Sequence, residues 1–154
     1  MKLPIEKELT TEEIAKLSSV YLTEGRKQEN WEILEVNIKN DILKARIRMI
    51  SSCISPFDKT DFHLPAFPIL EFLSQLAIIY GHIWAGYTEK TREVWLIESN
   101  IISKKAIRNP DNIQVTIKVV SIKKVGQNIL AIIQSQVFDD QGGLFEARIK
   151  GFLS

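Results

Sequence analysis

The chain has 154 residues, of which 45% are hydrophobic and 25% charged, which is the size and balance of one ordinary folded domain. Its 20 Lys and Arg against 19 Asp and Glu give a formal net charge of +1. No strong field is therefore available to hold nucleic acid or an anionic membrane surface. We expect residues 1–154 to form a single domain whose partners are not nucleic acids.

The few cysteines and histidines limit the chemistry further. The chain has one cysteine, Cys53, and two histidines, which excludes an internal disulfide and favours a reducing compartment. The N-terminus lacks the apolar core of a signal peptide, so we expect the cytoplasm. No metal-ligand spacing and no glycine-rich phosphate loop occur. We therefore expect neither a metal site nor a cofactor.

The first fifty residues predict a helix followed by a hairpin. The segment Thr10–Glu13 places a hydroxyl and a carboxylate three residues apart, the spacing of a capping box at a helix start. An apolar stripe follows over residues 14–21, and Gly25 suits the helix end. Period-two alternation then predicts strands over residues 31–36 and 42–50, joined by a polar turn over 37–41.

The middle of the chain carries one long apolar helix, predicted over residues 66–86. It is long enough to cross a bilayer at about 20 residues, but Glu71, Gln75 and His82 interrupt it. A helix that is apolar nearly all round must be wrapped by protein if it is not in lipid. We expect no membrane span, and a helix that is wrapped by a sheet.

Four β-rich runs supply the sheet, over residues 94–107, 113–125, 129–138 and 144–153. The last three should form an antiparallel meander. The order of elements resembles the hotdog fold, an α+β architecture in which a curved antiparallel sheet wraps a long central helix, here with an added N-terminal helix. The remaining face of the helix calls for a second subunit. We expect a homodimer, or a trimer of dimers.

The polar residues of the central helix share one face. Glu71, Ser74, Gln75, Ile78 and His82 fall within an arc about 100° wide, and an unpaired carboxylate cannot lie in a dry core. The stripe should therefore line a cleft or an interface. Two roles stay open for Glu71, which either pairs with a basic side chain such as Arg46 or Arg48, or acts as general base or nucleophile at an acyl group.

Two families share parts of this pattern. The segment from Pro65 to Gln75, PAFPILEFLSQ, resembles the central-helix motif of FabZ-type β-hydroxyacyl-ACP dehydratases, in which a proline is followed six residues on by the catalytic Glu and ten on by Gln. Glu71 and Gln75 match in type and spacing. The dehydratase His aligns with Phe57, or with Asp61 if the loop is two residues shorter, while His63 is out of register. The base for dehydration is then missing.

The segment Ser55–Ala66 is similar, without gaps, to the stretch that enters the central helix of FcoT-type long-chain fatty-acyl-CoA thioesterases. Phe57, Pro65 and Ser74 stand where that family has Tyr, Asn and Asn. Both resemblances imply an acyl-thioester protein with one carboxylate on its central helix.

We therefore predict an acyl-thioester hydrolase that acts on fatty acyl-CoA or acyl carrier protein. Glu71 would activate water or attack directly, Gln75 would orient it, and N–H groups around residues 66–69 would hold the thioester oxygen. The alternatives are a 3-hydroxyacyl-ACP dehydratase-like protein and a non-catalytic acyl-binding or scaffold subunit. The predicted substrate-binding residues are Phe57, Asp61, His63, Pro65, Ala66, Phe67, Ser74, Ile78 and His82.

Overall fold

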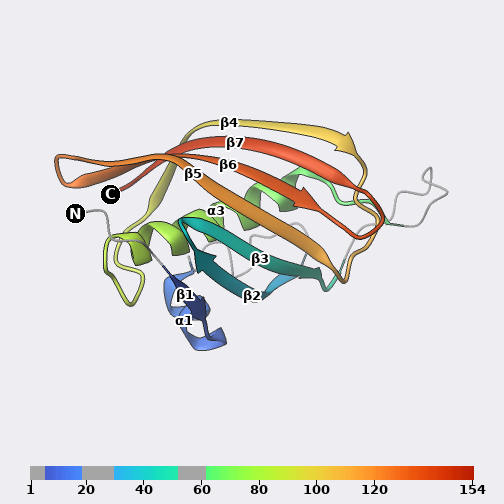
Figure 1. Ribbon diagram of the computed structural model, residues 1–154, viewed down its shortest axis with the longest axis horizontal. Coiled ribbons are helices and arrows are strands. Elements are labelled where there is room, and N and C mark those ends of the chain that lie inside the picture. The colour runs from blue at the N-terminus through green and yellow to red at the C-terminus, as the bar shows by residue number, and fades with distance from the viewer. Residues whose placement is uncertain (1–5, 19–29, 52–61) are drawn as a thin grey trace.

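A curved sheet wraps one long helix in the computed structural model, which describes residues 6–18, 30–51 and 62–154 (Figure 1). The chain begins with strand β1, Lys7–Leu9, and helix α1, Thr11–Leu17. Thr10 caps α1, since its hydroxyl accepts from the N–H of Glu13 while the Glu13 carboxylate accepts from the N–H of Thr10. The predicted capping box is confirmed, and residues 19–25 of that predicted helix lie outside the described residues.

The hairpin is formed by β2, Trp31–Lys39, and β3, Ile42–Met49. The five-residue turn predicted over 37–41 is wrong, because the alternation of β2 continues and buries Ile38. Only Asn40 and Asp41 turn, both with positive φ, at 52° and 61°. Two left-handed residues in succession are what a two-residue hairpin loop requires, and Asn and Asp tolerate that backbone.

The sheet is completed by four long strands after the central helix: β4, Val94–Lys105; β5, Ile113–Val125; β6, Asn128–Phe138; and β7, Leu144–Leu153. All neighbouring strands are antiparallel, in the order β1-β2-β3-β5-β6-β7-β4. The predicted meander of β5, β6 and β7 is confirmed. β4 pairs with β7, so it lies at one edge of the sheet.

The central helix α3 spans Ala66–Trp84 and packs along the concave side of the sheet (Figure 1). Its length and apolar composition would let it cross a membrane, yet 56% of its most apolar stretch is buried within the protein. Ile69, Phe72, Leu76 and Ile79 are fully buried against inward-facing sheet residues such as Ile117. The predicted α+β architecture, with a sheet around a long helix and an N-terminal helix, is confirmed.

Candidate functional site

The carboxylate of Glu71 lies in the first half of α3 and is half-buried. Its Oε2 atom accepts a hydrogen bond of 2.9 Å from the indole Nε1–H of Trp31, the first residue of β2. Trp31 is only 3% exposed, and its ring meets that of Phe72 edge to face at 5.9 Å and 82°. Glu71 is thus held by a packed, neutral donor from the sheet.

The alternative in which Glu71 pairs with Arg46 or Arg48 is wrong. Both arginines lie on the outer face of β3, where Arg46 pairs with Glu35 at 2.8 Å and Arg48 with Glu32. Inward and outward side chains alternate along a strand, and the inward positions here are the apolar ones between the arginines. Among the residues that the structure describes, no cation forms a salt bridge with Glu71.

The polar stripe of α3 does not form one continuous open face. Glu71 and Ser74 are half-buried, whereas Gln75, Ile78 and His82 are fully buried. The Ser74 hydroxyl donates to the Leu70 carbonyl one turn back, at 2.7 Å, a common local bond for a helical serine. Only the first turn of the stripe therefore reaches the surface.

His82 holds the end of α3 to the loop that follows. Its Nδ1 lies 2.8 Å from the Ile78 carbonyl, and its Nε2 accepts from the N–H groups of Thr91 and Arg92 at 3.1 and 3.2 Å. The ring is therefore neutral, with the proton on Nδ1. Burial lowers the pKa of His82 below its ordinary value, and the Ile78 carbonyl opposes this. With both nitrogens occupied, a substrate contact of His82 stays a prediction that this bonding does not support.

The N-terminus of α3 offers exposed backbone donors. Its N-cap, Pro65, makes no side-chain capping bond, and the first N–H groups of a helix have no partner within the helix. Ala66 and Phe67 are exposed, Phe67 at 66%, and Pro68 has no N–H to give. Within the described part of the chain, the first N–H groups of α3 have no hydrogen-bond partner. They lie at the positive end of the helix dipole, about one turn before Glu71, as the predicted oxyanion site requires. His63 lies half-buried just ahead of this turn, while Phe57 and Asp61 fall outside the described residues.

Asp139 fixes two turns at the same end of the sheet. Its Oδ2 accepts from the N–H groups of Arg108 and Asn109 at 2.6 and 3.0 Å, and its Oδ1 from those of Gln141 and Gly143 at 3.0 and 2.7 Å. Burial raises the pKa of Asp139, but the four backbone donors outweigh it, and the net pKa lies below its ordinary value. We call this arrangement the Asp139 clamp.

The Asp139 clamp sets the approach to α3. The guanidinium of Arg108 donates to the Phe62 carbonyl at 3.1 Å, and the N–H of Leu64 donates to the Ile107 carbonyl at 3.0 Å. Residues 62–64 are thereby tied to the turn that Asp139 holds, directly before the helix N-terminus. This role of Asp139 was not predicted from the sequence, although an Asp that opens a glycine-containing turn is typical of side-chain bonds to backbone N–H groups.

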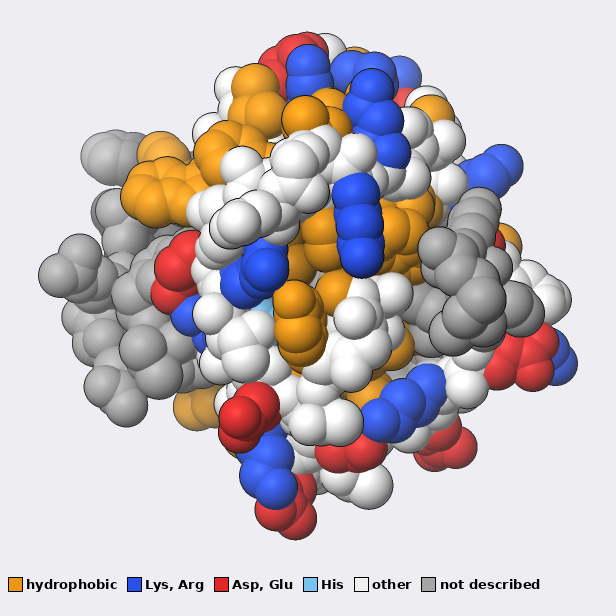
Figure 2. Space-filling model, turned by 90° about the vertical axis from the view of Figure 1, so that its left-hand side faces the viewer, with side chains coloured by type: hydrophobic (Ala, Val, Ile, Leu, Met, Phe, Trp, Pro, Cys, Tyr) orange, Lys and Arg blue, Asp and Glu red, His pale blue; other side chains and the backbone are white. Residues whose placement is uncertain are grey.

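An apolar cavity of about 50 Å³ lies between the second half of α3 and the sheet. Figure 2 views this end of the molecule, where hydrophobic side chains gather at the centre. Ala77, the lining residue nearest to Glu71 in α3, lies six residues, or about 9 Å, further along the helix. The lining includes Ala77, Tyr80, Val119, Ile122, Ala131 and Leu153.

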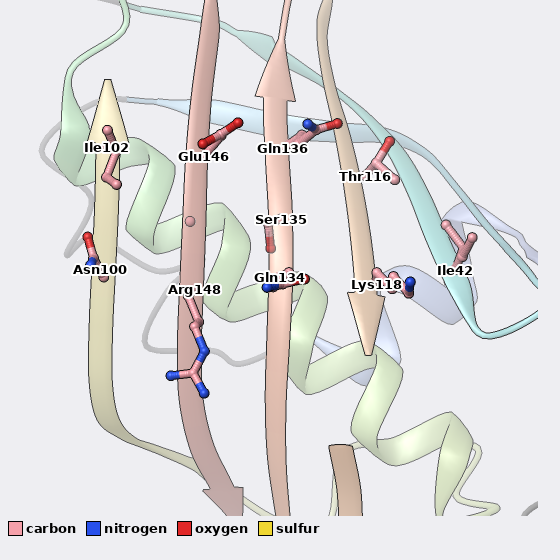
Figure 3. A pocket seen from close by; sticks show the side chains of 11 residues that line it. Ile42, Asn100, Ile102, Thr116, Lys118, Gln134, Ser135, Gln136, Glu146 and Arg148 are labelled. Atoms are coloured by element: carbon pink, nitrogen blue, oxygen red, sulfur yellow. The ribbon is translucent and has the colours of Figure 1, made fainter. Parts of the chain in front are cut away.

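A larger hollow of about 590 Å³ lies on the outer face of the sheet (Figure 3). Its side chains form two cross-strand rows, one of which runs through Lys118, Gln134 and Arg148 and the other through Thr116, Gln136 and Glu146. Charges of both signs lie there, with Lys118 and Arg148 in the first row and Glu146 in the second, 3.6 Å from Lys104. Because these residues face away from α3, the hollow is separate from Glu71, and a solvated sheet face accounts for it.

No protein-family model and no curated protein matches the sequence. Several solved structures match the fold. A hypothetical thioesterase from Streptococcus pneumoniae with coenzyme A has 13% identity and a TM-score of 0.55, over 81% of this chain and 86% of that one. A mutant thioesterase from Pseudomonas aeruginosa has 13% identity and a TM-score of 0.60, over 94% of both chains.

A protein from Streptococcus mutans bound to acetyl-CoA has 12% identity and a TM-score of 0.56, over 85% of this chain and 94% of that one. These structures share the sheet and the central helix rather than a recognisable sequence. The chain therefore has the fold of the hotdog thioesterases.

Proposed function

We propose that this protein hydrolyses acyl thioesters, of coenzyme A or of acyl carrier protein, with Glu71 as the catalytic carboxylate. The observation that carries the proposal is the state of Glu71, which is half-buried, held within the described residues by one neutral donor, and located between one and two turns from a helix N-terminus without a side-chain cap. Its second oxygen is then available to accept a proton from water.

The proposed reaction uses the carboxylate of Glu71 and the N–H groups at the helix N-terminus. Glu71 accepts a proton from a water molecule while the oxygen of that water adds to the thioester carbonyl carbon. The exposed N–H groups of Ala66 and Phe67 stabilise the oxyanion that forms. When the C–S bond breaks, the carboxyl of Glu71 returns its proton to the leaving thiolate. The products are a carboxylic acid and a thiol, and the carboxylate is restored.

Gln75 supports the carboxylate in this proposal. It follows Glu71 by one turn and is fully buried, which favours a role in orienting the carboxylate over contact with bulk water. The structural relatives with coenzyme A or acetyl-CoA support a CoA thioester as substrate.

We also infer that the working form is a homodimer joined along β4. One side of this edge strand pairs with β7, and the other side has no strand beside it within the described part of the chain. Natural sheets guard such edges with charge or cover, yet four large apolar residues of β4 are exposed: Trp95, Leu96, Ile97 and Ile102. A second β4 running antiparallel across a two-fold axis would continue the sheet and cover them.

The test is hydrolysis of short- to long-chain acyl-CoAs by Glu71→Gln. We expect kcat to fall at least about a hundredfold, as when a general base is lost. Glu35→Gln makes the same chemical change on the outer face, where Glu35 pairs with Arg46, and should leave kcat unchanged. If Glu71→Gln binds and hydrolyses acyl-CoA as the wild type does, the assignment of Glu71 fails. If the wild type binds acyl-CoA without hydrolysing it, the protein is the non-catalytic acyl-binding subunit that the sequence left as an alternative.

A further inference from the structure

Trp31 and Glu71 are 40 residues apart in the sequence and come from opposite layers of the fold. The indole can donate a hydrogen bond but cannot accept one, so its N–H can only face an acceptor. Here the acceptor is the Oε2 atom of Glu71 at 2.9 Å. Among the described residues, this is the one hydrogen-bond donor that contacts the carboxylate.

The indole itself is fixed. Trp31 is 3% exposed and its ring packs edge to face on Phe72, the residue after Glu71 in α3. A buried aromatic ring with such a contact loses little further entropy on making the bond. The donor is therefore preorganised, and the carboxylate adapts to it.

We infer that Trp31 is a positioning residue for Glu71: its indole N–H fixes Oε2 and leaves Oε1 to accept the proton from water. This inference rests on the proposed function of Glu71. A single donor suits the task, because it fixes one carboxylate oxygen, whereas a paired arginine would hold both oxygens.

The decisive variant is Trp31→Phe, which keeps an aromatic ring beside Phe72 and removes the N–H. Trp84→Phe is its matched control, since the Nε1 of Trp84 is buried with no hydrogen-bond partner within the described residues. The measurement is kcat and KM for an acyl-CoA across pH, with Tm recorded for each variant.

For Trp31→Phe we expect kcat near neutral pH to fall about tenfold, the size of one hydrogen bond to a charged group. KM and Tm should change little, because the aromatic ring that packs on Phe72 is kept and only the donor to Oε2 is lost. Trp84→Phe should keep the wild-type kcat and KM. A purely structural role of Trp31 would instead lower Tm or raise KM together with the loss of kcat.

A wild-type kcat in a folded Trp31→Phe overturns the inference even when Glu71→Gln is inactive. An active Glu71→Gln would instead contradict the proposed function, so failure of the inference and failure of the proposed function can be told apart. If Trp31→Phe does not fold, benzothienylalanine at position 31 replaces the N–H with sulfur in a ring of nearly the same shape. The same tenfold loss of kcat is then expected, and a wild-type kcat would equally contradict the inference.

Discussion

The Nε2 atom of His82 accepts a hydrogen bond of 3.1 Å from the backbone N–H of Thr91. With the second bond from Arg92 and the contact of Nδ1 with Ile78, the ring joins the last turn of α3 to the loop before β4. Protonation of Nε2 would abolish both accepted bonds. The neutral state of this histidine is therefore part of the folded structure.

Acid should weaken the fold through His82. Its folded pKa is depressed below the value of 6.5 by burial, although the Ile78 carbonyl acts in the opposite sense. The unfolded chain therefore binds the proton first, so the stabilisation is complete above about pH 6.5 and is lost as the pH falls through the folded pKa. The measurement is Tm between pH 7.5 and pH 5, which should decline less in His82→Leu than in the wild type.

His82→Leu should also be less stable at pH 7.5, by about 2 kcal/mol, because the part-buried N–H groups of Thr91 and Arg92 lose their acceptor. Parallel declines of Tm in the two proteins would mean that His82 does not titrate as its contacts require.

Asp139→Asn should destabilise the protein by about 3 kcal/mol. The amide lacks the negative charge, and its NH2 group would face two of the backbone N–H donors from which a carboxylate oxygen now accepts. Asp140→Asn is the matched control, since Asp140 is the exposed neighbour that accepts from the side chain of Asn109. Its effect should stay within about 0.5 kcal/mol. Urea unfolding of the two variants measures the change in the free energy of unfolding. Equal losses in the two variants would show that the Asp139 clamp adds no more stability than the exposed Asp140 does.

Gly143→Ala tests the same clamp from the side of packing. A Cβ atom at this position would lie 2.5 Å from the Cα of Ile107 and 2.6 Å from the carbonyl oxygen of Ala106. Both neighbours are backbone atoms that cannot rotate away, so we expect a loss of about 2 kcal/mol or more. Gly126→Ala has open space around its Cβ but a positive φ of 63°, so it should cost only about 1 kcal/mol.

The dimer inferred along β4 predicts a monomer when that strand is charged. Ile97→Lys places an ammonium in the exposed apolar surface of β4, and a lysine at a sheet edge opposes pairing with another chain. Light scattering at micromolar concentration should give the mass of a dimer, or of a trimer of dimers, for the wild type and of a monomer for Ile97→Lys. Lys123→Glu, on the far part of β5, should leave the mass unchanged. A monomeric wild type would refute the inferred assembly.

Regular elements were predictable because their signals are local. The periodicity of α3 and the alternation in the long strands fixed both type and extent to within two residues. β1 was missed because Lys7–Leu9 is too short to show a pattern and is a strand only through its pairing with β2. The turn was predicted too long because Asn37 and Lys39 are polar. They lie on the outer face of β2 and still belong to the strand.

The site was predictable only in part, for the same reason. Helical spacing placed Glu71 and Gln75 on one face, but burial of Gln75 and the bond from Trp31 depend on which strand lies against that face. The turn that begins at Asp139 was visible in the sequence. The hydrogen bond from the N–H of Arg108 to Asp139 was not, because it joins the β6–β7 turn to the separate loop between β4 and β5. Contacts between distant segments have no periodic signature.

The Asp139 clamp has a consequence for the order in which the molecule is assembled during synthesis. The helix that carries Glu71 leaves the ribosome long before the turn between β6 and β7, yet the residues that lead into that helix are tied to this turn through Arg108. A nascent chain that ends before residue 139 has the carboxylate without the tether of its helix. The end of α3 that carries Glu71 is therefore among the last parts of the protein to mature.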